Sequence, residues 1–182
     1  VECLVIALII LQRQVGEGLE DGLVGRIQRK GDDDGGQGIA RDEQGHAAWC
    51  LSHLPAGTTP SVTTPSGAQQ VLRPLLDVAL ENAREGCVHE TFSAVVSGAQ
   101  AQRGPSTLQY GLARLAAEEQ QHACLAWRVH AWAMEQLDEM QQTAVTAEMA
   151  RGRADLWAGL QGVVPGDIQA LGVPDASLLH TL

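Results

Sequence analysis

The chain has 182 residues and a formal net charge of −10; hydrophobic residues make up 45% of it and aromatic residues only 3%. Its 12 Lys and Arg are spread along the sequence, which disfavours nucleic acids and anionic membrane surfaces as partners, because both attract a basic face. The hydrophobic fraction is too high for a disordered chain of this charge, and the scarcity of aromatic residues argues against a sheet protein. The composition therefore predicts an all-α fold.

The N-terminal region combines an apolar run with a glycine-rich stretch. The apolar run, residues 3–11, is far shorter than the about 20 residues that a transmembrane helix needs. No basic residue precedes it, so it lacks the pattern of a secretory signal. Eight of the residues at 16–38 are glycine, and each glycine costs a helix about 1 kcal/mol relative to alanine. We expect an apolar helix over 1–15, followed by an irregular segment.

The cysteines are few and widely spaced. The chain has four, none of them in a C-x-x-C pair: Cys3, Cys50, Cys87 and Cys124. This usage favours buried, reduced thiols and a cytoplasmic protein.

Breaks rich in proline and glycine divide the rest of the chain into helical segments. Residues 55–67 hold three prolines among serines and threonines, which predicts a long crossover connection. Gly104, Pro105 and Ser106 form a tight break, with Ser106 as the candidate N-cap of the next helix. The predicted elements are helices at 38–54, 68–102 and 106–151, and a tail of short helices and loops at 152–182. With the helix at 1–15, this pattern predicts a four-helix bundle in residues 1–151, with the tail packed on it.

A Glu-x-x-His motif occurs twice, as Glu43 with His46 and as Glu119 with His122. Residues three apart share one face of a helix, and in the last predicted helix that face is the core stripe. The stripe steps by four and three through Leu108, Leu112, Leu115, Glu119, His122, Ala126, Val129 and Ala133. Burying a carboxylate and an imidazole without compensation costs several kcal/mol. A bound metal ion would remove that cost, so both motifs are candidate metal ligands.

The helix at 68–102 places a further acidic residue on an apolar stripe. That stripe runs through Leu76, Leu80, Ala83, Cys87, Glu90 and Ala94. Glu90 and Glu119 are equidistant from position 104.5, in the tight break, so they should lie at the same depth of an antiparallel helix pair. Glu85, the alternative, places the midpoint at 102 and lies off the stripe, where we expect it to be solvated. We therefore predict Glu90 as the third-helix ligand and interpret Cys87 as a packing residue.

The pattern resembles the ferritin-like di-iron carboxylate proteins, in which two helices each give one Glu and two others each give a Glu-x-x-His. Residues 76–134 resemble bacterial ferritin-like domain proteins, above all at 85–91 (EGCVHET), 118–123 (EEQQHA) and 125–128 (LAWR). Residues 40–50 match more briefly, so the resemblance covers about 70 of the 182 residues. The resemblance implies a ferritin-like four-helix bundle with one long crossover. It also implies two iron ions, with manganese as the alternative, that react with dioxygen or peroxide. The implied metal ligands are Glu43, His46, Glu90, Glu119 and His122.

The resemblance departs at the first helix, where the family carries one more metal-binding Glu. The available acids stand in no recognisable motif, so we expect a divergent or truncated first helix; they are Glu2, Glu17 and Glu20. Two functions stay open at this point. One is an oxidoreductase of the oxidase or ferroxidase type, whose partners are metal ions and dioxygen or peroxide. The other is a metal-free helical scaffold or interaction module with a decayed site; homo-oligomer formation is left open in both.

Overall fold

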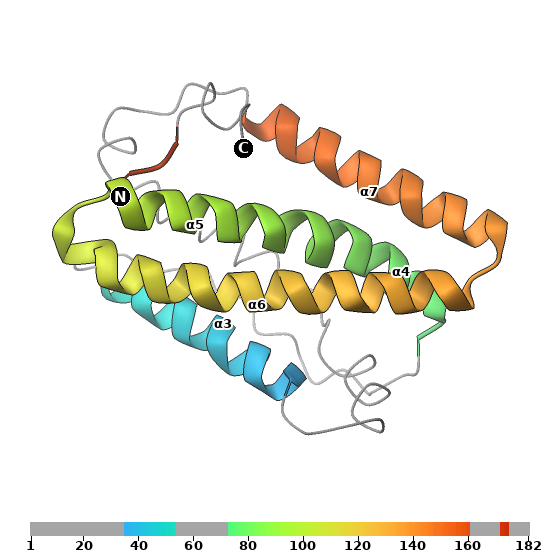
Figure 1. Cartoon of the computed structure of the whole chain (residues 1–182), viewed down its shortest axis with the longest axis horizontal. Helices are drawn as coiled ribbons and strands as arrows, with labels where there is room; N and C mark the ends of the chain where they lie inside the picture. Colours follow the sequence, from blue (N-terminus) through green and yellow to red (C-terminus); the bar gives the residue numbers. More distant parts are fainter. Residues whose placement is uncertain (1–34, 54–72, 161–171, 175–182) are drawn as a thin grey trace. The chain divides into compact units, whose positions relative to one another are not determined.

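The computed structural model describes residues 35–53, 73–160 and 172–174, and in these residues every regular element is helical (Figure 1). This confirms the all-α prediction for the described part of the chain. None of its helices is both long and apolar enough to cross a membrane. The chain divides into two compact units, Val1–Arg73 and Pro74–Leu182, which are described separately below. The division into a bundle at 1–151 and a tail at 152–182 stays a prediction.

The first unit is represented by α3, Gly35–Ser52. This helix confirms the one predicted at 38–54, although both of its ends lie slightly nearer the N-terminus. His46 and Cys50, one turn apart, are buried, so α3 has one buried face. The helix predicted at 1–15, the crossover at 55–67 and the first-helix acids lie outside the described residues; these acids are Glu2, Glu17 and Glu20.

The second unit begins with three segments that form one continuous rod, α4 (Leu75–Glu81), η2 (Asn82–Glu90) and α5 (Thr91–Arg103) (Figure 1). The middle segment, η2, is π-helical. The rod confirms the predicted helix from Leu75 onward, but the prediction was wrong for residues 73–74, which are not helical. The cause is Pro74 in the N-cap position, because the residue before a proline is disfavoured in the α region.

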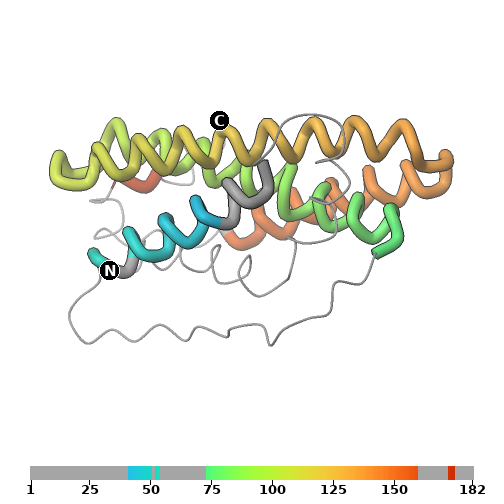
Figure 2. Tube along the Cα trace, turned by 90° about the horizontal axis from the view of Figure 1, so that it is seen from below, coloured from blue at the N-terminus to red at the C-terminus, as the bar shows by residue number. Residues whose placement is uncertain are grey.

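The next helix, α6 (Ser106–Gln136), runs back beside the rod (Figures 1 and 2). The tight break was predicted correctly, but Pro105 takes the N-cap position and Ser106 is the first helical residue. Gly172 packs against this turn with a positive φ of 84°. A Cβ on Gly172 would lie 2.5 Å from the backbone nitrogen of Gly104, so only glycine fits this approach.

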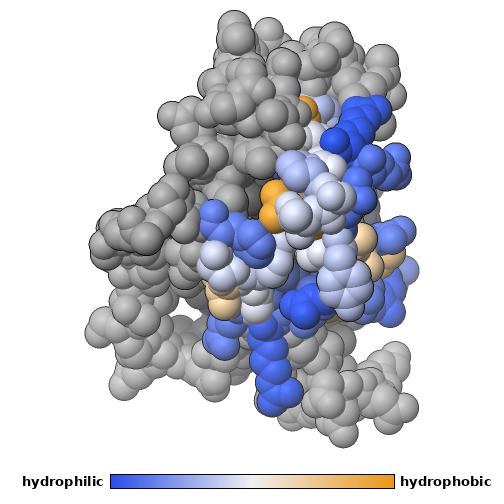
Figure 3. Space-filling model, turned by 90° about the vertical axis from the view of Figure 1, so that its left-hand side faces the viewer, coloured by the Kyte–Doolittle hydropathy of each residue, from blue (hydrophilic) through white to orange (hydrophobic). Residues whose placement is uncertain are grey.

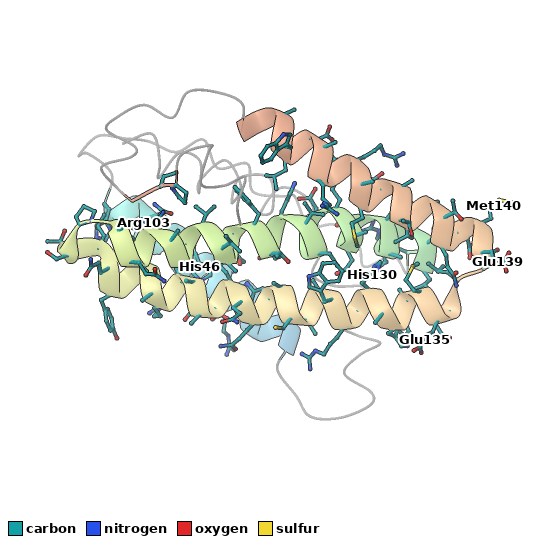
Figure 4. The ribbon with its side chains drawn as sticks, turned by 45° about the horizontal axis from the view of Figure 1, so that its top comes forward. His46, Arg103, His130, Glu135, Glu139 and Met140 are labelled. Carbon is teal, nitrogen blue, oxygen red and sulfur yellow. The ribbon has the colours of Figure 1, made fainter. Side chains whose placement is uncertain are left out.

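The prediction of a single helix at 106–151 is wrong. The chain breaks after Gln136, and a separate helix, α7, spans Glu139–Leu160. Leu137 is extended, and Asp138 caps the new helix. The Asp138 Oδ1 accepts a hydrogen bond from the backbone N–H of Gln141 at 2.8 Å, and the Gln141 Oε1 accepts one from the Asp138 N–H at 3.1 Å. This reciprocal pair is a capping box. Glu135, Glu139 and Met140 lie exposed around the turn (Figure 4).

The α7 helix replaces the first nine residues of the predicted irregular tail and packs on the rod. It passes through Gly152, where a Cβ would lie 3.1 Å from the Cγ of Arg84, so the missing side chain lets the rod approach. Arg84 bonds Glu148 and Asp155 of α7. The apolar core of this region is shared by the rod, the end of α6 and α7: Ala79, Ala83, Ala133, Leu137 and Val145. In the described part of the second unit, the rod, α6 and α7 therefore pack together.

Candidate metal centre

The predicted core stripe of α6 is confirmed around the second Glu-x-x-His motif. Its flanking apolar members Leu112, Leu115, Ala126, Val129 and Ala133 are buried. Glu119 and His122 are buried among them, each only 4% exposed. A carboxylate and an imidazole therefore lie inside the apolar face of α6, as the phase of the sequence predicts.

Glu90 of the rod faces this motif across the second unit. One ligand atom from each of Glu90, Glu119 and His122 lies within 4.8 Å of the others. The Glu90 Oε2 is 3.9 Å from the His122 Nδ1. The placement of Glu90 opposite the motif, predicted from the position of the turn, is confirmed.

Glu85, the alternative acid of the rod, has a different partner. Its Oε2 lies 2.7 Å from the Nδ1 of His89, within hydrogen-bonding distance, and its Oε1 lies 3.7 Å from the Nε of Arg84. Glu85 is 15% exposed, so the expectation that it is solvated was wrong.

The π-helical segment η2 explains how Glu90 reaches the site. Buried residues of the rod come in neighbouring pairs at 78–79, 82–83 and 87–88. The step between pairs is four residues and then five, where an α-helix alternates three and four. The step of five marks one extra residue in the turn, which is the property of a π-helix. Such segments occur frequently at functional sites.

Glu43 and His46 lie one turn apart on α3 of the first unit. The Glu43 Oε1 is 3.6 Å from the His46 Nδ1, and His46 is 2% exposed. The first Glu-x-x-His motif is thus helical, with its imidazole buried, as predicted. A site formed jointly by this motif and the residues of the second unit is a proposal.

The chemistry of the second-unit group suits a hard or borderline cation. Two carboxylates and one imidazole converge in an apolar setting, where a positive ion compensates two like charges. Cys87 is buried nearby on η2, and its Sγ lies 3.6 Å from the Ala126 carbonyl oxygen. Burial raises the pKa of the Cys87 thiol to about 12, so it stays protonated at neutral pH. The interpretation of Cys87 as a packing residue agrees with this environment.

Two further residues of α6 lie around the group rather than in it. His130 extends from α6 toward the rod (Figure 4), and its ring meets Trp127 edge-on. Burial lowers the pKa of His130. Trp127 donates a hydrogen bond from its Nε1 to the Oγ1 of Thr91 at 3.0 Å, and Thr91 is the residue directly after Glu90. Trp127 therefore joins α6 to the rod beside Glu90.

The cysteine prediction is confirmed for two thiols and wrong for one. Cys50 and Cys87 are buried thiols outside any disulfide, whereas Cys124, also in no disulfide, is exposed. Cys124 lies on α6 two residues beyond His122, and that step turns it to the outer face of the helix. Cys3 lies outside the described residues.

Comparisons with protein-family models, with curated proteins and with solved structures found no match. The ferritin-like assignment therefore rests on the residues themselves. The described residues give an all-helical protein with a buried carboxylate and imidazole group. At the end of the second unit that carries the α5–α6 turn, the visible described side chains are mostly hydrophilic, with small hydrophobic patches (Figure 3).

Proposed function

We propose that this chain is a metal-binding, ferritin-like protein with a carboxylate-bridged di-iron site that reacts with dioxygen or peroxide. The observation that carries the proposal is the convergence of Glu90, Glu119 and His122 within 4.8 Å in the second unit. Glu119 and His122 lie buried on the apolar stripe of α6, where apolar side chains would pack without a desolvation cost. A bound cation would compensate the cost of burying these polar groups.

The proposed ligand set pairs the two Glu-x-x-His motifs. His46 and His122 would each ligate one ion, and Glu43, Glu90 and Glu119 would ligate or bridge. Oxygen and nitrogen donors of this kind suit iron or manganese. The repeat of one motif on α3 and α6 supports two ions rather than one.

The residues would act by binding and by exclusion of water. When bound, two Fe(II) ions supply two electrons, which with two protons reduce dioxygen to hydrogen peroxide or peroxide to water. The carboxylates hold the charge that such ions carry, in a site whose low polarity strengthens each contact. Leu115 and Ala126, buried on either side of the α6 motif, keep bulk water from it.

The test is a titration of the purified full chain with Fe(II) under anaerobic conditions, followed by exposure to dioxygen. We expect two ions bound per chain and oxygen uptake on mixing. Glu119→Gln should abolish both. The matched control is Glu118→Gln, because Glu118 is the neighbouring carboxylate and pairs with Arg114 on the outside of α6, at 3.3 Å.

Each outcome of this titration decides between two functions. Stoichiometric iron binding that survives in Glu118→Gln and disappears in Glu119→Gln supports the di-iron proposal. A wild-type chain that binds no iron, and whose thermal unfolding is unchanged by a chelator, would instead support the metal-free scaffold.

A further inference from the structure

The π-helical segment η2 is tied to α6 by one buried side chain. Asn82, the first residue of η2, is 5% exposed. Its Nδ2 donates a hydrogen bond to the carbonyl oxygen of Ala126 at 3.0 Å. Ala126 lies one turn beyond His122 on the same stripe of α6. The amide of Asn82 thus contacts α6 next to the candidate metal centre.

The two helices approach very closely at this contact. A Cβ on Gly86 would lie 2.8 Å from the Ala126 Cβ and 2.7 Å from the Asn82 Oδ1. These separations are too short for a side chain, so glycine at 86 and alanine at 126 permit the approach. The amide and the small residues together form one fixed contact between η2 and α6.

The spacing between the two contacts shows what the π-helix does. From Asn82 to Glu90 the rod uses eight residues, whereas α6 uses seven from Ala126 back to Glu119. Seven residues make about two turns of an α-helix. The buried pairs of the rod at 82–83 and 87–88 lie five residues apart, so the rod holds one extra residue in this stretch, and η2 takes it up. If η2 relaxed to an α-helix beyond Asn82, Glu90 would rotate by about 100° and His89 would take its place.

We propose that Asn82 is a positioning residue that holds η2 in its π-helical register and so keeps Glu90 turned toward Glu119 and His122. The inference rests on the proposed metal site, and it adds a residue that no ligand motif contains. An isolated π-turn is less favourable than an α-turn, so a tertiary bond must hold it. The buried amide supplies that bond, because an Asn82 Nδ2 without an acceptor would be costly.

A second set of contacts on η2 provides a control. The side chain of Arg84, also in η2, extends toward α7 and forms ion pairs with Glu148 and Asp155. Loss of these pairs should weaken the packing of η2 on α7 without touching its contact with α6. Arg84→Met is therefore the matched variant, which alters η2 but spares the proposed register bond.

The experiment measures Co(II) binding to the full-length chain by its visible d–d absorption. Asn82→Leu keeps the approximate size of the side chain but removes the donor. We expect Co(II) affinity to fall by about 10- to 100-fold, the range typical of residues that orient metal ligands, and the absorption bands to shift. Arg84→Met should keep the wild-type affinity and bands, whatever its effect on thermal stability.

A one-residue deletion supplies the readout that a merely structural role would not give. Deletion of Glu85 shortens the step from Asn82 to Glu90 from eight residues to seven, so an α-helix alone brings both into register with α6. In that background, Asn82→Leu should no longer weaken Co(II) binding. Circular dichroism confirms that each variant is folded before its titration is interpreted.

The outcomes separate this inference from the proposed function. A wild-type chain that binds no Co(II) overturns the metal site and the inference with it. A wild-type chain that binds Co(II), together with an Asn82→Leu variant of equal affinity and identical bands, overturns the role of Asn82 alone. Weakening of equal size in Arg84→Met or in the Glu85-deleted background also overturns it.

Discussion

The guanidinium of Arg84 and the carboxylate of Glu148 meet between η2 and α7, with Nη1 3.0 Å from Oε1. Arg84 also pairs with Asp155 through its Nη2, at 2.6 Å. Arg151 of α7 bonds the same Glu148 carboxylate. The π-helical segment is thus held on one side by charged groups and on the other by the buried amide of Asn82.

The charged side gives the second unit a predictable response to acid. Hydrogen bonds from Arg151 and Arg84 lower the pKa of Glu148 below its ordinary value of 4.5. Because the folded pKa is the lower one, the carboxylate contributes its full stabilisation above 4.5 and loses it as the pH falls through the folded pKa. The urea midpoint of the wild type should therefore drop more steeply below about pH 5 than that of Glu148→Gln. Parallel pH profiles for the two proteins would contradict this prediction.

The capping box between α6 and α7 predicts a measurable loss of stability. Asp138→Ala removes the acceptor of the Gln141 N–H, so the free energy of unfolding should fall by about 1 kcal/mol. Glu135→Ala is the control, because Glu135 is an exposed acid near the same turn and outside the cap. Urea unfolding of the three proteins measures the difference. Equal midpoints for the two variants would show that the cap contributes nothing.

Two glycines of the rod should respond oppositely to alanine. Gly86→Ala places a Cβ 2.8 Å from the Ala126 Cβ, and we expect a loss of about 1–3 kcal/mol from overpacking. Gly98 has open space at its Cβ position, so Gly98→Ala should stabilise the helix by up to about 1 kcal/mol. Thermal unfolding of both variants tests the pair. A Gly86→Ala variant as stable as Gly98→Ala would mean that η2 and α6 do not approach as described.

Much of the second-unit site was predictable because helical phase and a tight turn constrain it. The alternating steps of the α6 stripe fix Glu119 and His122 on the buried face, and the turn at Gly104 sets the depth of Glu90. Each of these arguments needs only local spacing, which the sequence contains in full. The second-unit residues proposed as metal ligands can therefore be selected from the sequence alone.

The π-helical segment η2 and its effect on the direction of Glu90 were not predictable in the same way. The extra residue in η2 appears in the step of five between buried pairs of the rod, and the burial of these residues is known only from the structure. The break before α7 had a local signal, Asp138 followed three residues later by Gln141. It was missed because no glycine or proline interrupts the chain there. Gly152 is the first residue of the predicted tail, but it lies inside α7 and allows Arg84 to pack against that helix.

A bound metal should stabilise the fold, because an ion that binds only the folded chain shifts its unfolding equilibrium. At a free concentration 100 times the Kd, the gain is about 2.7 kcal/mol. We predict that Fe(II) or Co(II) raises the unfolding temperature of the wild type and that a chelator reverses the increase. His122→Ala should lose the increment, since it removes a buried imidazole of the proposed site. His53→Ala should keep it, because His53 is exposed at the end of α3 and, within the described residues, its hydrogen bonds go to Trp49 and Ser52. Equal metal-induced shifts in the two histidine variants would place the bound ion elsewhere and remove His122 from the ligand set.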